Sequence, residues 1–132
     1  MRRAISVIFV VAAVAFFFAL CFECSAAHAA GSREAVEAAK SKGMPVFVDV
    51  GSTHCIPCKK MVPVLEGLTK RYKGRLEVIF VDFDKEKKFA RELGATMIPT
   101  QIIYDKAGRE VRRHVGYISL EDCEKLLKES GI

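Results

Sequence analysis

Residues 45–62 read PVFVDVGSTHCIPCKKMV, and they combine a buried strand, a turn and the start of a helix. Residues 46–50 form a short apolar run with one carboxylate, which is typical of a strand covered on both faces. The helical periodicity of residues 55–72 begins directly after the Gly-Ser-Thr-His turn. Cys55 and Cys58 are therefore predicted to stand in the first turn of a helix that follows a strand.

Outward from this stretch, the sequence alternates between helices and strands. Ser32 is the predicted N-cap of a first helix, and Gly43 ends that helix. Apolar spacing predicts helices over residues 33–42, 85–93 and 120–129, and strands over residues 76–81, 101–104 and 110–115. Two βα repeats followed by a hairpin predict an α/β domain whose mixed sheet carries helices on both faces.

The composition bounds the class of protein. The chain has 132 residues, of which 51% are hydrophobic and 28% charged, and this fits one globular domain. Its net charge is only +5, and lysines are interspersed with glutamates along the predicted helices. This pattern predicts a solvated surface of mixed charge and no nucleic-acid partner.

The first 29 residues have the pattern of a secretory signal peptide. Arg2 and Arg3 precede the uncharged apolar run of residues 4–22, and Ala27-His28-Ala29 supplies the small residues of a cleavage site. The apolar run has 19 residues, close to the roughly 20 that span a bilayer, so an uncleaved N-terminal membrane anchor is the alternative. Both alternatives place the domain of residues 30–132 outside the cytoplasm.

The two cysteines of the motif predict redox chemistry. Residues three apart share a helix face, so their sulfurs can close a small disulfide ring. Free N–H groups and the helix dipole at the N-terminus favour a thiolate, so Cys55 is the predicted nucleophile and Cys58 the resolving cysteine. Pro57 has no N–H, which the first turn tolerates. A zinc site or a static disulfide is the alternative, but Cys123 lies on an apolar helix face as predicted core, so we expect no metal site.

Asp49 is the second candidate. A charged, unpaired carboxylate inside an apolar strand is unfavourable, so the pKa of Asp49 is expected to be raised. It lies six residues before Cys55, where it could exchange a proton with Cys58. An aspartate at a frayed strand end that faces water is the alternative.

Ile98 and Pro99 are the third. Pro99 stands at the start of a predicted strand, where a cis peptide bond would leave the Ile98 backbone free to pair with an extended substrate chain. From the residues alone, a trans turn proline is the default.

With these residues identified, the exported part resembles thioredoxin over nearly its whole length. The matching residues, at the spacing of that family, are Phe47-Val48-Asp49, the Cys55–Cys58 motif, Pro63, Ile98-Pro99-Thr100 and Gly116. The resemblance implies the thioredoxin-like fold, with a mixed sheet of four or five strands. It also implies the strand order 76–82, 45–50, 100–105, 109–115 and a cis bond before Pro99.

The resemblance further implies thiol–disulfide exchange through a Cys55–Cys58 redox disulfide, with Asp49 as buried proton acceptor and donor and with no cofactor. The residues expected to contact the substrate are His54, Ile56, Pro57 and Ile98.

For the biological role, the resemblance favours a monomeric reductase of disulfides in exported proteins. We expect it in a bacterial periplasm or at the outer face of the inner membrane, with a membrane electron donor of the DsbD or CcdA kind. The alternatives are a thiol oxidase or disulfide isomerase of the same fold, and a metal-handling module that binds through the two cysteines and a histidine.

The sequence departs from the family's pattern at four points. His54 and Ile56 replace the tryptophan and glycine that are common around the motif, and Phe80 replaces the lysine that often accompanies the buried carboxylate. A protonated His54 could stabilise the Cys55 thiolate, or it could be an exposed loop residue. The first strand of the family is short or missing.

Overall fold

The computed structural model describes residues 31–132, and four strands form its central sheet. The elements follow one another as α2 (Ser32–Ser41), β1 (Val46–Gly51), α3 (Ile56–Arg71), β2 (Glu77–Asp82), α4 (Lys87–Glu92), β3 (Thr100–Tyr104), β4 (Glu110–Val115) and α5 (Leu120–Glu129). The prediction of a signal peptide or anchor falls on residues 1–29, outside the described residues. Within residues 31–132, none of the helices has the length and apolar character needed to cross a membrane.

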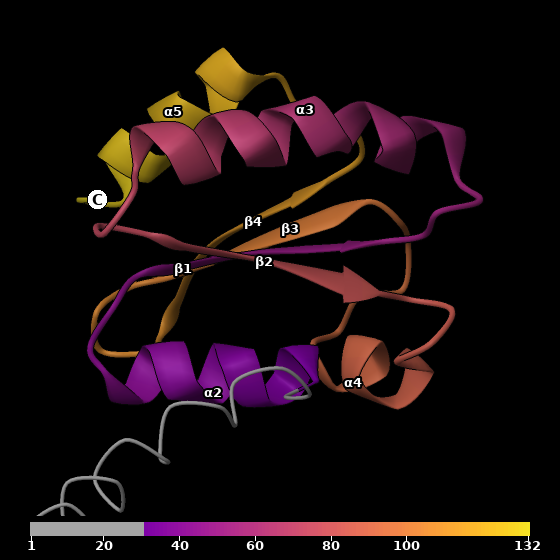
Figure 1. Cartoon of the computed structure of the whole chain (residues 1–132), viewed down its shortest axis with the longest axis horizontal. Coiled ribbons are helices and arrows are strands. Elements are labelled where there is room, and N and C mark those ends of the chain that lie inside the picture. Colours follow the sequence, from indigo (N-terminus) through magenta and orange to yellow (C-terminus); the bar gives the residue numbers. More distant parts are fainter. Residues whose placement is uncertain (1–30) are drawn as a thin grey trace, which may run out of the picture. The chain divides into compact units, whose positions relative to one another are not determined.

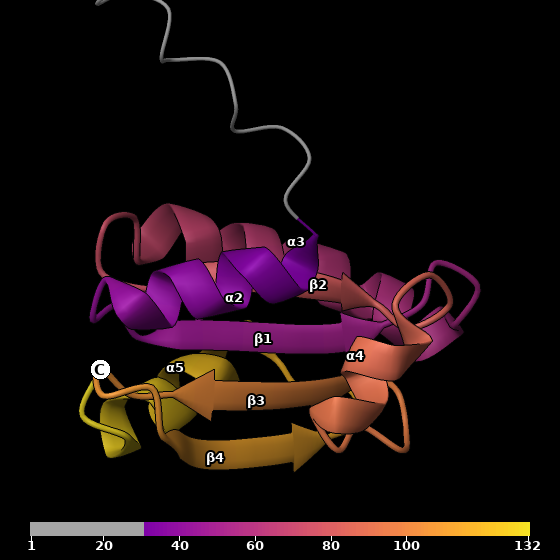
Figure 2. The ribbon, with the colours of Figure 1, turned by 90° about the horizontal axis from the view of Figure 1, so that it is seen from below.

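The strand order is β2-β1-β3-β4, as the resemblance implies. β1 runs parallel to β2 and antiparallel to β3, and β3 pairs antiparallel with β4 (Figure 2). No strand precedes α2 within residues 31–132, so the sheet has four strands in the described part of the chain.

Helices cover both faces of the sheet, so the fold has three layers (Figure 1). Helices α3 and α5 lie on one face, and α2 and α4 lie on the other. Each face has its own apolar core: Val46, Val48 and Val50 point toward α2 and α4, whereas Phe47 packs with α3 and α5. Because β1 is central and covered twice, all six of its residues are buried.

The alternation along β1 decides which residues face the motif. Successive side chains of a strand point to opposite faces, so Phe47, Asp49 and Gly51 all face α3 and α5. The turn after β1 and the loop before β3 lie at the same end of the sheet (Figure 1). The cysteine motif and Pro99 are therefore placed at one edge of the domain.

Two predicted helix starts are wrong. The N-cap of α2 is Gly31, and Ser32 is the first helical residue. Helix α4 begins at Lys87 because the carboxylate of Asp82 accepts the backbone N–H groups of Asp84 and Lys85, which holds these residues in a turn. Pro63 lies inside α3, which continues through it to Arg71.

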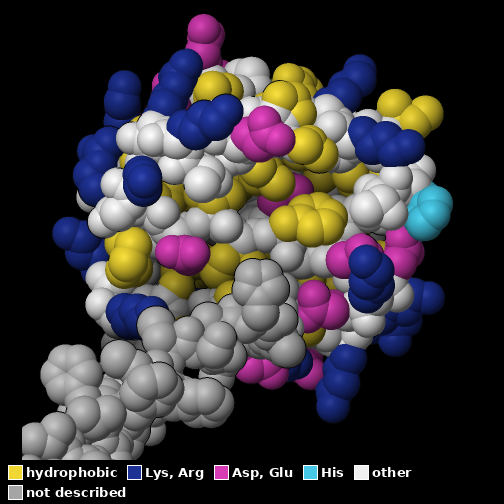
Figure 3. Space-filling model, in the orientation of Figure 1, with side chains coloured by type: hydrophobic (Ala, Val, Ile, Leu, Met, Phe, Trp, Pro, Cys, Tyr) yellow, Lys and Arg dark blue, Asp and Glu magenta, His cyan; other side chains and the backbone are white. Residues whose placement is uncertain are grey.

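The surface carries mixed charge. On the face in view, basic and acidic side chains are interspersed among apolar ones (Figure 3). Several oppositely charged side chains pair, for example Arg71 with Glu124 at 2.8 Å and Arg113 with Glu110 at 2.8 Å. Such pairs in solvent add little to stability.

Candidate active site

Cys55 and Cys58 form a disulfide at the N-terminus of α3. Cys55 is the N-cap residue, and its Sγ accepts the backbone N–H of Cys58 at 3.2 Å. The two sulfurs differ in access, since Cys58 is only 4% exposed whereas Cys55 is half-buried. An N–H donor and the positive end of the helix dipole thus converge on the outer sulfur, and both favour its thiolate in the reduced protein.

Asp49 is fully buried, so the alternative of an aspartate facing water is wrong. Burial raises its pKa from 3.8 to about 6, although a hydrogen bond from Gln101 acts in the opposite direction. Two residues further along the same face, Gly51 lies directly beneath Cys58. A Cβ atom at Gly51 would come within 3.3 Å of the Cys58 Cβ and 3.5 Å of its Sγ. Asp49 therefore lies on the face of β1 that the buried sulfur covers.

Gln101 is the site residue that sequence reasoning missed. It pairs with Asp49 across the β1–β3 register, and its Nε2 donates to Asp49 Oδ1 at 2.7 Å. Its side chain is 1% exposed. The sequence does contain a signal for this residue, because Gln101 is a glutamine near the start of a largely apolar strand. A buried amide there needs a polar partner, which Asp49 provides.

Phe80 occupies the other side of Asp49. It is the register partner of Asp49 in β2, and one edge of its ring lies 3.0 Å from where a Gly51 Cβ would stand. The register partner of Asp49 on β2 is therefore an aromatic ring and not a cation. Phe80 and Cys58 also line a largely apolar hollow of about 440 Å³ beside α3.

The Ile98–Pro99 peptide bond is cis, as the resemblance implies. The Pro99 carbonyl accepts the Gly116 N–H at 2.8 Å, which ties this loop to the end of β4. The Ile98 side chain packs partly against the core beneath α2 and α4. Neither its N–H nor its C=O makes a backbone hydrogen bond with residues 31–132.

Comparisons with known proteins agree with this geometry. A family model described as a thioredoxin-like domain matches residues 32–131. The chain belongs to the thioredoxin-like family. Thioredoxin 1 of a Nostoc species is 33% identical over 86 residues, which are 65% of this chain and 79% of that protein. Thioredoxin of Staphylococcus aureus is 35% identical over 81 residues, 61% of this chain and 77% of that protein.

Two further comparisons concern a much longer protein and a crystal structure. The bifunctional thioredoxin reductase/thioredoxin of Mycobacterium leprae is 40% identical over 76 residues, which are 58% of this chain and only 16% of that longer protein. The crystal structure of the germline-specific thioredoxin Deadhead from Drosophila melanogaster superposes with a TM-score of 0.64 at 21% identity. It covers 74% of this chain and 89% of that one, and it supports the fold. Together with the Cys55–Cys58 pair, the homologues make this thioredoxin-like protein a thiol–disulfide oxidoreductase.

The turn before the motif is held by Ser52. Its buried hydroxyl donates to Asp84 and accepts the His54 N–H at 3.0 Å, while its carbonyl accepts the Cys55 N–H at 3.3 Å. The hydrogen bond from Ser52 is the main cause that lowers the pKa of Asp84. The His54 ring is 87% exposed, with Nδ1 3.4 Å from the Asp84 carboxylate. His54 is thus a solvent-exposed loop residue with an acidic neighbour.

We expect Ser52→Ala to lower the free energy of unfolding by about 1–2 kcal/mol, because it removes the buried hydroxyl that donates to Asp84 and accepts the His54 N–H. Chemical denaturation of the oxidised protein measures this loss. The exposed neighbour provides a matched control, since Thr53→Ala should change stability by less than about 0.5 kcal/mol. Equal effects of the two substitutions would contradict the role given to Ser52.

The remaining predicted substrate contacts are at the surface. Ile56 is 72% exposed, and Pro57 is also exposed in the first turn of α3. Cys123 is buried in α5, as expected, and burial raises the pKa of its thiol to about 12. Within residues 31–132, no three histidine, cysteine or acidic side chains cluster as metal ligands would.

Proposed function

We propose that this thioredoxin-like protein reduces disulfide bonds in exported proteins outside the cytoplasm. The observation that carries the proposal is the asymmetry of its two sulfurs. Cys55 Sγ is partly open to solvent and accepts an N–H at the start of α3, whereas Cys58 is buried over the end of β1. One sulfur is suited to attack a partner and the other to release it.

The first step begins with both cysteines reduced. The Cys55 thiolate attacks one sulfur of the substrate disulfide, forms a mixed disulfide and expels the other substrate sulfur as a thiolate, which takes up a proton. The helix N-terminus favours the Cys55 thiolate, the form that attacks.

The second step regenerates the disulfide of the structure. The Asp49 carboxylate takes the proton of the Cys58 thiol, and the resulting thiolate attacks Cys55 Sγ. The Cys55–Cys58 bond forms, the mixed disulfide breaks, and the second substrate sulfur leaves as a thiolate, which takes up a proton. Two electrons have passed from the protein to the substrate. The pKa of Asp49, about 6, leaves it mostly ionised at neutral pH and able to accept this proton.

Substrate binding is proposed at the surface around Cys55. The free backbone groups of Ile98, next to cis Pro99, suit hydrogen bonding with an extended peptide. The exposed side chains of Ile56, Pro57 and His54 border the same sulfur in the sequence. A site that binds mainly backbone would accept many exported proteins.

The extracytoplasmic location is proposed from the N-terminal sequence, with Arg2 and Arg3 before the apolar run of residues 4–22. A reductase in an oxidising compartment needs an electron supply, which a membrane carrier of the DsbD or CcdA kind would provide. Mass spectrometry of the native N-terminus distinguishes cleavage after Ala29 from a retained anchor. A full-length chain found in the cytosol would contradict export.

The direction of electron flow is tested by the reduction potential. We expect the purified protein, equilibrated against dithiothreitol or glutathione buffers, to have a potential near −270 mV, as is typical of thioredoxin. A value near −120 mV, as in a strong thiol oxidant, would instead identify the same site as an oxidase.

A further inference from the structure

The Asp49 carboxyl has one hydrogen-bond partner among residues 31–132, and this partner is the Gln101 amide. Gln101 Nε2 donates to Asp49 Oδ1 at 2.7 Å, and both side chains are shielded from solvent. The second oxygen of each group, Asp49 Oδ2 and Gln101 Oε1, is buried and accepts no hydrogen bond from the described residues.

The hydrogen bond from Gln101 and the burial of Asp49 have opposite effects on the ionisation of its carboxyl. The amide N–H favours the carboxylate, because it donates to a charged oxygen. Burial of the carboxyl, with no donor to Oδ2 among the described residues, disfavours the same carboxylate. A proton on Oδ2 removes the charge and turns that oxygen into a donor. The Gln101 amide therefore opposes the effect of burial and keeps the carboxyl able to ionise.

No other described side chain takes this role. On the surrounding elements, Cys58 on α3 lies over Gly51, two residues along β1 from Asp49, and Cys123 on α5 is near enough for the charge of Asp49 to act on it. On β2, the register partner of Asp49 is Phe80. Burial, and then the charge of Asp49, raise the pKa of the Cys123 thiol to about 12, so it stays protonated.

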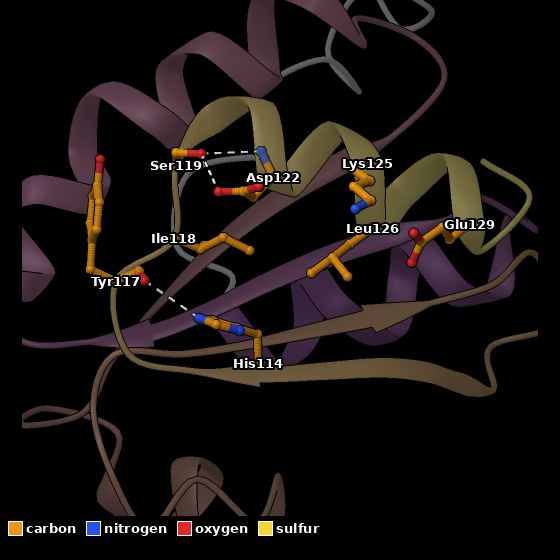
Figure 4. A pocket seen from close by; sticks show the side chains of 8 residues that line it. All are labelled: His114, Tyr117, Ile118, Ser119, Asp122, Lys125, Leu126 and Glu129. Carbon is orange, nitrogen blue, oxygen red and sulfur yellow. Dashed lines mark hydrogen bonds between the residues drawn. The ribbon is translucent and has the colours of Figure 1, made fainter.

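His114 is the register partner of Gln101, but it is turned elsewhere. Its ring lies in a cavity of about 410 Å³ between β4 and α5, with Nε2 3.4 Å from the Tyr117 carbonyl (Figure 4). Of the side chains in residues 31–132, only that of Gln101 makes a hydrogen bond to the Asp49 carboxyl.

We propose that Gln101 is a positioning residue for the exchange reaction, which holds Asp49 Oδ1, leaves Oδ2 to exchange the proton with Cys58, and sets how readily Asp49 ionises. The inference rests on the proposed role of Asp49 as proton acceptor. In this proposal the neutral Gln101 amide on β3 stabilises the Asp49 carboxylate, as a cation on β2 would do if one were present.

The test compares Gln101→Met, which keeps the length of the side chain, with the unmodified protein. Carboxyl ¹³C NMR should show the midpoint of the Asp49 titration moving up by about one pH unit, because the donor to the carboxylate is lost. The pH dependence of insulin reduction should shift in the same direction as the Asp49 midpoint. Activity should fall up to about tenfold below pH 6 and be unchanged near pH 9, where Asp49 is ionised in both proteins.

Thr100→Val is the matched control. Thr100 is equally buried in the same strand, but its hydroxyl donates to the Met97 carbonyl and not to Asp49. It should leave the Asp49 titration unchanged, and an equal shift in this variant would overturn the proposal. An unmoved or lowered midpoint in Gln101→Met would also overturn it.

A measurement on the unmodified protein guards against a variant that fails to fold. The NMR chemical shifts of the Gln101 side-chain amide protons should change with pH, with the same midpoint as the Asp49 carboxyl. Chemical shifts that do not change between pH 4 and 8 would overturn the proposal. If Asp49→Asn kept the full activity profile while Gln101→Met still moved the Asp49 midpoint, the proton-acceptor role would fail and the pairing would stand.

Discussion

Cys55→Ser is expected to reduce the insulin-reducing activity of this protein, with dithiothreitol as electron donor, to the uncatalysed background. A serine hydroxyl is not ionised at neutral pH, so the helix N-terminus has no thiolate to stabilise and no mixed disulfide can form. Turbidity of the precipitating insulin chains measures the loss. Activity at the wild-type level would contradict the assignment of Cys55 as nucleophile.

Two other cysteine substitutions separate this role from general damage. Cys58→Ser should also lose turnover, but it should accumulate a mixed disulfide between Cys55 and the substrate, visible by mass spectrometry, because the resolving thiol is gone. Cys123→Ala removes a thiol that is buried in α5 and held protonated. It should retain activity, and a large loss there would mean that the assay reports folding.

The parts of the site that could be predicted from the sequence lie close together along the chain. The Cys55–Cys58 spacing fixes the helical first turn, and the apolar run before it fixes the strand that carries Asp49. These features depend on local periodicity and capping, which a sequence displays directly. The cis bond at Pro99 came from the family resemblance, since a trans bond is the default for an isolated proline.

The missed contacts join residues that are distant in the sequence. Gln101 meets Asp49 only because β3 pairs antiparallel with β1 in one register, and a shift by a single residue would turn the amide to the other face. Ser52 meets Asp84 across 32 residues, through the parallel pairing of β1 and β2. Neither register can be read from composition or periodicity, so the hydrogen bonds that support the motif appear only in the folded chain.

Replacing Asp49 by asparagine is expected to stabilise the protein by roughly 3 kcal/mol at pH 8 and to leave its stability nearly unchanged at pH 3. Burial raises the pKa of Asp49 from 3.8 to about 6 in the folded state, and each unit corresponds to about 1.4 kcal/mol. A raised folded pKa means that the contribution of this group is fully present below about pH 4 and is lost as pH rises through about 6. Asparagine carries no charge, so the variant escapes that loss.

Urea denaturation of both oxidised proteins at several pH values measures the difference between their unfolding free energies. Other carboxylates, such as Asp84 and Asp105, have lowered pKa values, so their contribution to the stability of the folded protein is lost on acidification. They do so in both proteins, so they cancel in the comparison and only the titration of Asp49 remains. A difference that does not change with pH would mean that Asp49 titrates at an ordinary pKa. It could not then hold a proton near neutrality, as the resolving step requires. Stabilisation at high pH together with slower release of the mixed disulfide would show that the protein keeps a destabilising buried acid because Cys58 needs it.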